Sequence, residues 1–279
     1  MMTGKFHPKP VPIPHTMRPT HAFLSAALLA LLPASIQAAK TETFTLAPIP
    51  PSTIGGNVIA IVPDAYDGST AFPSLLLLHG AGDDEKAWPQ KAGDVGTVAD
   101  KFHRIILCPS AGPLSWYNPH NGSEPYVMEN VLPAAAKRYK LSDDHWIAGN
   151  SMGGYGSLRL FADYPKVFTA VIAFSPGTKP SRWVKNWGIS AAFGPGLTTG
   201  DEDTFTDAWL KRLANNTRPI VMVCGDKDFF LKDFNECLAA ADKAGVKVIT
   251  YPTQGGHDWG YWTRELPRAL DKVPVAVKR

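Results

Sequence analysis

The sequence has few cysteines, little excess charge of either sign and no apolar run long enough to cross a membrane. The formal net charge of 279 residues is only +3, and the lysines and arginines form no run, so neither a nucleic acid nor an anionic membrane surface is indicated as a partner. The three cysteines do not have the paired spacing of a metal site. A content of 44% hydrophobic and 19% charged residues is that of an ordinary globular protein with one large core.

The odd number of cysteines leaves at least one thiol free. Cys108 and Cys224 end apolar runs typical of central strands, where a thiol usually serves as a small buried hydrophobe. A disulfide between Cys224 and Cys237 is the less favoured alternative, and it requires an oxidising compartment.

Residues 1–38 differ in composition from the rest of the chain. Residues 8–19 are rich in proline, and residues 22–32 form an apolar run of the length of a signal-peptide core, with Arg18 as its positive flank. The run is shorter than a membrane span, and no cysteine follows it that could carry a lipid. We therefore expect a secretion signal and its upstream segment in residues 1–38, a single domain in residues 39–279, and a secreted or periplasmic protein without a stable membrane anchor.

Apolar runs and helical patterns alternate along the remaining chain, which predicts an α/β protein with a mostly parallel sheet covered by helices on both faces. The expected strands are 41–46, 57–62, 75–78, 105–108, 146–148, 171–174, 220–223 and 246–251. The expected helices are 126–139, 155–164, 231–244 and 261–270, with another beginning at Asp83 or Asp84. The segment 175–219 contains several aromatic residues, Trp183 and Trp187 among them, which either roof a substrate pocket or form a satellite core.

Residues 149–154 read Gly-Asn-Ser-Met-Gly-Gly, which contains the nucleophile-elbow pattern G-x-S-x-G. In this element a strand turns at once into a helix with the serine at a strained apex, and glycines let the two backbones pass closely. The alternative to an elbow is an ordinary glycine-rich turn that happens to contain a serine. An apolar run before Ser151 and a helical pattern after it favour the elbow.

A serine hydroxyl is a poor nucleophile, so Ser151 needs a histidine that accepts its proton and a carboxylate that orients the histidine. In folds with a nucleophile elbow, the three residues occur along the chain in the order serine, acid, histidine. Asp228 and His257 follow the last two expected strands in that order. Asp226 is a close rival for the acid. Asp258 adjoins the histidine in sequence, and we interpret it as a capping or loop-bracing group.

The tetrahedral oxyanion of such chemistry requires two backbone N–H donors. We assign these to Met152, which follows the nucleophile, and to Ala81, in the glycine-rich loop after the expected strand 75–78. His79 is interpreted as a packing residue that holds this loop. The acidic residues 83–85 could suggest a cation site, but such a cluster at a helix start more often caps amide groups. We expect no metal and no organic cofactor.

Five motifs occur in a specific order and together resemble the putative-esterase (esterase D-like) family, which includes tributyrin and feruloyl esterases, S-formylglutathione hydrolases and mycolyltransferases. They are HGAGDD at 79–84, SWY at 115–117, GNSMGGYG at 149–156, CGDKDFFL at 224–231 and GHDWGYW at 256–262. The resemblance implies an α/β-hydrolase fold without a large lid. It also implies that Trp116 and Tyr117 lie beside the active site and bind substrate by packing the acyl pocket.

The sequence thus predicts a serine carboxylesterase that acts through an acyl-enzyme on a small-molecule or carbohydrate-linked ester. One alternative is an acyltransferase of the same family, in which an alcohol or sugar replaces water as the acceptor. A second alternative, from a different class, is a non-catalytic binding protein on a hydrolase scaffold.

Overall fold

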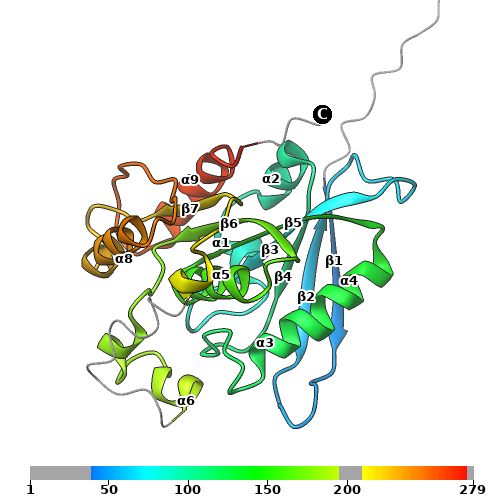
Figure 1. Cartoon of the computed structure of the whole chain (residues 1–279). Coiled ribbons are helices and arrows are strands. Elements are labelled where there is room, and N and C mark those ends of the chain that lie inside the picture. Colours follow the sequence, from blue (N-terminus) through cyan, green and yellow to red (C-terminus); the bar gives the residue numbers. More distant parts are fainter. Residues whose placement is uncertain (1–38, 195–208, 275–279) are drawn as a thin grey trace, which may run out of the picture. The chain divides into compact units, whose positions relative to one another are not determined.

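The computed structural model describes residues 39–194 and 209–274 of the chain (Figure 1). By its contacts the chain divides into two units, Met1–Ile36 and Gln37–Arg279, and all described residues belong to the second. The predicted secretion signal therefore lies outside the described residues.

A seven-stranded sheet forms the centre of the described domain, in the order β1-β2-β4-β3-β5-β6-β7. Strands β1 and β2, and β2 and β4, pair antiparallel, whereas every pairing from β4 through β7 is parallel. The mostly parallel sheet confirms the predicted fold class. The strands are β1 Lys40–Leu46, β2 Gly56–Val62, β3 Phe72–Leu78, β4 Ile105–Pro109, β5 Leu141–Asn150, β6 Phe168–Phe174 and β7 Ile220–Val223.

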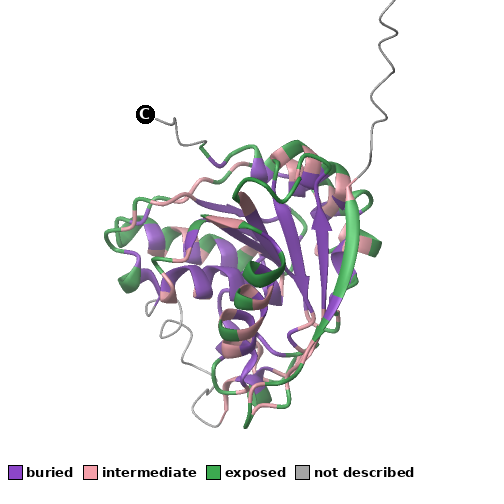
Figure 2. Ribbon diagram, turned by 90° about the vertical axis from the view of Figure 1, so that its right-hand side faces the viewer, coloured by how far each residue is buried: buried purple, intermediate pink, exposed green. Residues whose placement is uncertain are grey.

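Helices cover both faces of the sheet, and each face has its own apolar core (Figure 2). Helices α4, α5 and α8 pack on one face, and α2 and α9 pack on the other. In the part of the chain that the structure describes, no helix is long and apolar enough to cross a membrane. The helical elements are α1 Ala87–Lys91, α2 Val95–Phe102, α3 Ser123–Pro125, η1 Tyr126–Val131, α4 Leu132–Arg138, α5 Met152–Asp163, η2 Pro180–Trp183, α6 Ile189–Phe193, α8 Leu231–Lys243 and α9 Trp259–Leu270.

The helix after β3 begins later than the sequence predicts, at Ala87 instead of Asp83 or Asp84. The Asp83 N–H donates to the carbonyl of Gly80, and the Asp84 carboxylate accepts a hydrogen bond from the Lys86 N–H. Aspartate side chains bond readily to the backbone two residues on, which favours a turn over a helix. The acidic cluster therefore shapes a loop before the helix.

The prediction of a regular strand at 246–251 is wrong. Among the described residues this stretch forms only isolated parallel bridges, between Ile249 and Val221 and between Thr253 and Gly225. Between the two bridges lies Pro252, which has no N–H to donate to a ladder. The segment still follows the edge of β7 and carries the chain to the next loop.

The predicted helix 126–139 is present but begins with π-helical geometry, in η1, before it continues as α4. Pro133 lies at the start of α4 and cannot donate the hydrogen bond that a regular helix would require there. A local widening of the helix accommodates this missing donor.

All three cysteines are buried and free. Burial raises the pKa of each thiol, to about 12 for Cys237. The alternative of a disulfide between Cys224 and Cys237 is therefore not realised in the structure, and the thiols serve as small apolar core residues.

Candidate active site

Ser151 lies at the junction of β5 and α5 with a strained backbone, φ 55° and ψ −115°. Positive φ is uncommon for a residue with a side chain and needs support from the surrounding structure. Here the Ser151 N–H donates to the carbonyl of Phe174 at the end of β6, at 2.9 Å, and the Ser151 carbonyl accepts the Tyr155 N–H at 3.0 Å. These bonds hold the serine at the carboxyl edge of the parallel strands.

Two glycines of the motif are required by close backbone contact. A β-carbon placed on Gly153 would lie 2.5 Å from the carbonyl oxygen of Leu78, and one on Gly149 would lie 2.5 Å from the carbonyl group of Gly153. Such distances are far shorter than a van der Waals contact, so any side chain at either position would push α5 away from β3. The glycines thus bring Ser151 against the loop that follows β3.

The structure brings Ser151, His257 and Asp228 together, although they come from three separate loops. His257 Nε2 lies 2.9 Å from Ser151 Oγ, and His257 Nδ1 lies 2.9 and 3.0 Å from the two carboxylate oxygens of Asp228. The Asp228 side chain is fully buried and also accepts the Phe230 N–H at 2.8 Å. This arrangement has the geometry of a serine-histidine-acid triad.

The two rival aspartates have other partners. Asp226 is exposed and accepts the Gly255 N–H at 2.9 Å, so it braces the loop that carries His257. Asp258 is the N-cap of α9 and accepts the Tyr261 N–H at 2.9 Å, as its interpretation as a capping group predicts. Of these three carboxylates, it is Asp228 that contacts the imidazole.

Both residues assigned to the oxyanion amides adjoin Ser151. Met152 is the first residue of α5, where backbone N–H groups have no partner within the helix. Ala81 lines the same cavity as Ser151. Its loop is held by His79, whose buried ring contacts the carbonyl oxygens of Gly80 and Ser110, as expected of a packing residue.

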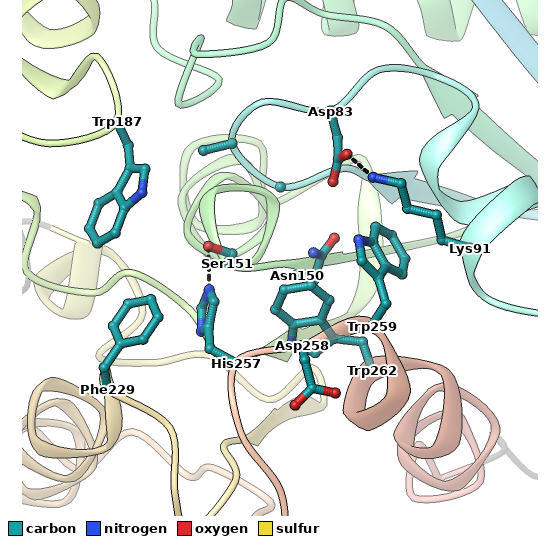
Figure 3. Close-up of a pocket in the computed structure, with 12 residues that line it drawn as sticks. Asp83, Lys91, Asn150, Ser151, Trp187, Phe229, His257, Asp258, Trp259 and Trp262 are labelled. Atoms are coloured by element: carbon teal, nitrogen blue, oxygen red, sulfur yellow. Dashed lines mark hydrogen bonds and ion pairs between the residues drawn. The ribbon is translucent and has the colours of Figure 1, made fainter.

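The triad opens into a cavity of about 500 Å³ (Figure 3). Trp187 and Phe229 lie at one end, and Asp83, Lys91 and Trp259 at the other, with Ser151 and His257 between them. The complete lining is Gly80, Ala81, Asp83, Lys91, Asn150, Ser151, Trp187, Phe229, His257, Asp258, Trp259 and Trp262. The cavity therefore has an aromatic end and a polar end.

At the aromatic end, the rings of Trp187 and Phe229 stack with centroids 5.6 Å apart and an interplanar angle of 17°. Phe229 is 48% exposed, and its ring lies 4.2 Å from that of His257. Trp183 instead donates its indole N–H to Asp233 at 2.7 Å and packs beneath the aromatic end. The two hypotheses for this segment, a roof over the substrate pocket and a satellite core, therefore each apply to one tryptophan. Trp187 faces the cavity, and Trp183 belongs to the packing below it.

Trp116 and Tyr117 require a correction, because the structure buries them behind the site. Both side chains are almost inaccessible to solvent, and neither is among the described residues that line the cavity. The Tyr117 ring packs on Gly156 of α5, and its hydroxyl donates to the His79 carbonyl at 3.1 Å. The Trp116 indole donates to the carbonyl of Trp187 at 2.9 Å. These residues support the elbow helix and the cavity wall from behind, without reaching the substrate space.

The acidic residues 83–85 make contacts within the protein. Asp83 pairs with Lys91, and buried Glu85 accepts a hydrogen bond from the Asn57 side chain at 3.2 Å. Within residues 39–194 and 209–274, no group of three or more histidine, cysteine or acidic side chains is arranged to hold a metal ion.

Comparison with known proteins shows the family of the chain. Residues 55–273 match the family described as Putative esterase. An acetyl esterase of Caldicellulosiruptor saccharolyticus is 27% identical over 223 residues, which cover 71% of this chain and 82% of that protein. A ferulic acid esterase structure is 25% identical, with a TM-score of 0.70, over 84% of this chain and 97% of that one. A fluorophosphonate-binding serine hydrolase of Staphylococcus aureus shares the fold, with a TM-score of 0.74 at 20% identity, over 84% of this chain and 98% of that one.

The fold and the site thus define an α/β-hydrolase. The chain belongs to the Putative esterase family and is a serine hydrolase that acts on carboxylic ester bonds.

Sequence reasoning gave no role at the site to several residues that line the cavity, among them Asn150, Lys91 and Phe229. Asn150 and Phe229 lie beside predicted triad members, so their position in the motifs was a usable signal. Lys91 lies at the end of α1 and reaches the cavity beside Asp83, with which it forms an ion pair, and no local pattern indicates this contact.

Asp228 and Asp226 can be separated by isosteric substitution. Asp228→Asn should lower kcat by about 10⁴ because the amide no longer holds the required imidazole tautomer. Asp226→Asn keeps an acceptor for the Gly255 N–H and should cost far less. Steady-state kinetics on a p-nitrophenyl ester measures both variants, and the opposite ranking would move the acid to Asp226.

Trp187 and Trp183 should respond differently to truncation. Trp187→Ala should change the ratio of butyrate to octanoate hydrolysis, because its indole borders the substrate cavity. Trp183→Ala should instead lower the free energy of unfolding, on the order of 3 kcal/mol, because it removes a packed indole and the donor to Asp233. Thermal unfolding and the two rates are measured on both variants, and each serves as the control for the other. An unchanged ratio in Trp187→Ala would exclude Trp187 from substrate binding.

Proposed function

We propose that this protein is a secreted or periplasmic carboxylesterase that hydrolyses its substrate through an acyl-enzyme intermediate. The observation that carries the proposal is the continuous contact from Ser151 Oγ through the His257 ring to the buried Asp228 carboxylate, with heavy-atom distances of 2.9 Å on each side of the ring. This chain of contacts provides a nucleophile, a base and an orienting acid within hydrogen-bond distance.

In the proposed mechanism, Ser151 Oγ attacks the ester carbonyl while His257 Nε2 accepts the hydroxyl proton. The N–H groups of Ala81 and Met152 stabilise the negative charge that develops on the carbonyl oxygen. Protonated His257 then gives its proton to the leaving alcohol. Water, activated by the same imidazole, attacks the acyl-enzyme and regenerates Ser151.

The substrate class follows from the relatives and from the cavity. Two similar proteins are named as an acetyl esterase and a ferulic acid esterase, and both names denote hydrolysis of an ester. We infer that this chain also uses water as the acceptor and takes a small-molecule or carbohydrate-linked ester. The aromatic end of the cavity, formed by Trp187 and Phe229, offers an apolar wall for one part of such a substrate.

The alternative of a non-catalytic binding protein is disfavoured because no triad side chain is missing or displaced.

Ser151→Ala tests the nucleophile. The variant should fold normally but lose about six orders of magnitude in kcat, as removal of one interdependent triad member does. It should also lose covalent labelling by a fluorophosphonate probe, whereas the folded wild-type protein forms one adduct on Ser151. Retention of a tenth of the wild-type rate would remove Ser151 from the mechanism, and an unlabelled wild type would favour the binding protein.

Export is proposed from the composition of residues 1–38. The full-length chain, expressed in a bacterium with a general secretion system, should appear outside the cytoplasm with its amino terminus at Ala39. Intact mass of the exported protein measures this. An unprocessed chain confined to the cytoplasm would contradict it.

A further inference from the structure

Asn150 is the fully buried residue that directly precedes Ser151, and its exposed fraction is 0%. Neither its Nδ2 nor its Oδ1 has a hydrogen-bond partner within the described protein. Buried polar side chains are nearly always hydrogen-bonded, and leaving both ends of a carboxamide unpaired destabilises the folded protein. An unpaired group of this kind therefore requires an explanation.

The position of the carboxamide relates it to the substrate. Asn150 is one of the residues that line the active-site cavity, and Figure 3 shows it in the region between Ser151 and Trp259. It also packs against the loop of the proposed oxyanion donors, because a β-carbon on Gly80 would lie only 2.9 Å from Nδ2. The absence of a side chain at Gly80 leaves the space that the carboxamide occupies.

The surroundings indicate what the carboxamide would bind. The polar end of the cavity also contains Asp83 and Lys91, which form an ion pair and so neutralise each other. Lys91 in turn lies over the ring of Trp259, with Nζ 5.4 Å from the centroid. A paired charge beside a neutral carboxamide favours a neutral polar ligand over an ion. A hydroxyl group both donates and accepts, so it can pair with either Oδ1 or Nδ2 of the side chain.

We propose that Asn150 is a substrate-binding residue, whose carboxamide pairs with a hydroxyl group of the ester at the polar end of the cavity. The inference rests on the proposed carboxylesterase function and adds a specificity determinant to it. The hydroxyl belongs either to the alcohol part or to the acyl part of the ester, and the substrates below separate these sources.

The test compares esters that differ by hydroxyl groups. Ethyl butyrate and glycerol monobutyrate differ in the alcohol part, and ethyl butyrate and ethyl β-hydroxybutyrate differ in the acyl part. Asn150→Leu replaces the carboxamide by an apolar group of similar shape. It should reduce the kcat/KM preference for the hydroxylated ester of one pair about three- to tenfold, the effect of losing one neutral hydrogen bond. The responding pair identifies the part of the substrate that the polar end binds.

Stability provides a second readout. Because the carboxamide has no partner within the described protein, Asn150→Leu should melt at or above the wild-type temperature, whereas a structural hydrogen bond would make it melt lower. Ser181→Ala is the matched control. Ser181 Oγ is also buried and without a partner among the described residues, but it lies on η2, away from the cavity lining. This control should keep both the melting temperature and the substrate preferences.

Three outcomes would overturn the inference. The first is an unchanged preference in both ester pairs. The second is a lower melting temperature of Asn150→Leu, which would show that the carboxamide makes a structural hydrogen bond within the protein. The third is a wild type that hydrolyses none of the three esters and reacts with no fluorophosphonate, in which case the proposed function fails as well. A wild type that hydrolyses all three, with preferences unaffected by the substitution, contradicts the inference alone.

Discussion

The close contact between the elbow and the end of β3 is the constraint on which the site depends. Gly153 and Gly149 leave no room for a β-carbon, so α5 rises directly from β5 beside the carbonyl of Leu78. This contact places Ser151 in a strained conformation, with the Met152 N–H at the helix start and the Ala81 loop beside it. Strain of this kind persists only where the surrounding structure supports it, and bonds to β6 and α5 provide that support here.

A second tight contact brings the acid and the histidine to the same edge. A β-carbon on Gly225 would lie 2.2 Å from the carbonyl oxygen of Gly255, and the Asp226 carboxylate and Lys227 N–H bond to the backbone of Gly255. The loops after β7 and before α9 are thereby joined along their backbones. The orientation of His257 therefore depends on backbone contacts as well as on its own bond to Asp228, and Asp226 contributes to these contacts without touching the imidazole.

The two ends of the cavity differ in how fully the protein pairs the groups that line them. The aromatic end is packed from below, since Trp183 and Phe230 contact Trp187 and the carbonyl of Trp187 accepts the Trp116 indole. The polar end instead retains Asn150, whose carboxamide has no partner within the described protein. Rigid apolar walls and a few unsatisfied polar groups are the usual composition of a small-molecule site, because apolar area supplies affinity and polar groups supply orientation.

The sequence by itself determined the seven strands of the sheet, the elbow and the three triad candidates, because each depends on local signals: apolar runs, helical periodicity, and glycines next to reactive side chains. It also predicted an eighth strand, 246–251, that is not a regular strand. The helix after Ser151 nevertheless starts three residues earlier than its pattern predicts, since packing against β3 outweighs the low helix propensity of glycine. Only the tertiary structure decided that Trp116 and Tyr117 are buried behind the site, that Trp187 faces the cavity while Trp183 does not, and that Lys91 reaches the polar end. These facts depend on which elements pack against one another, and residues distant in sequence meet in ways that no local pattern encodes.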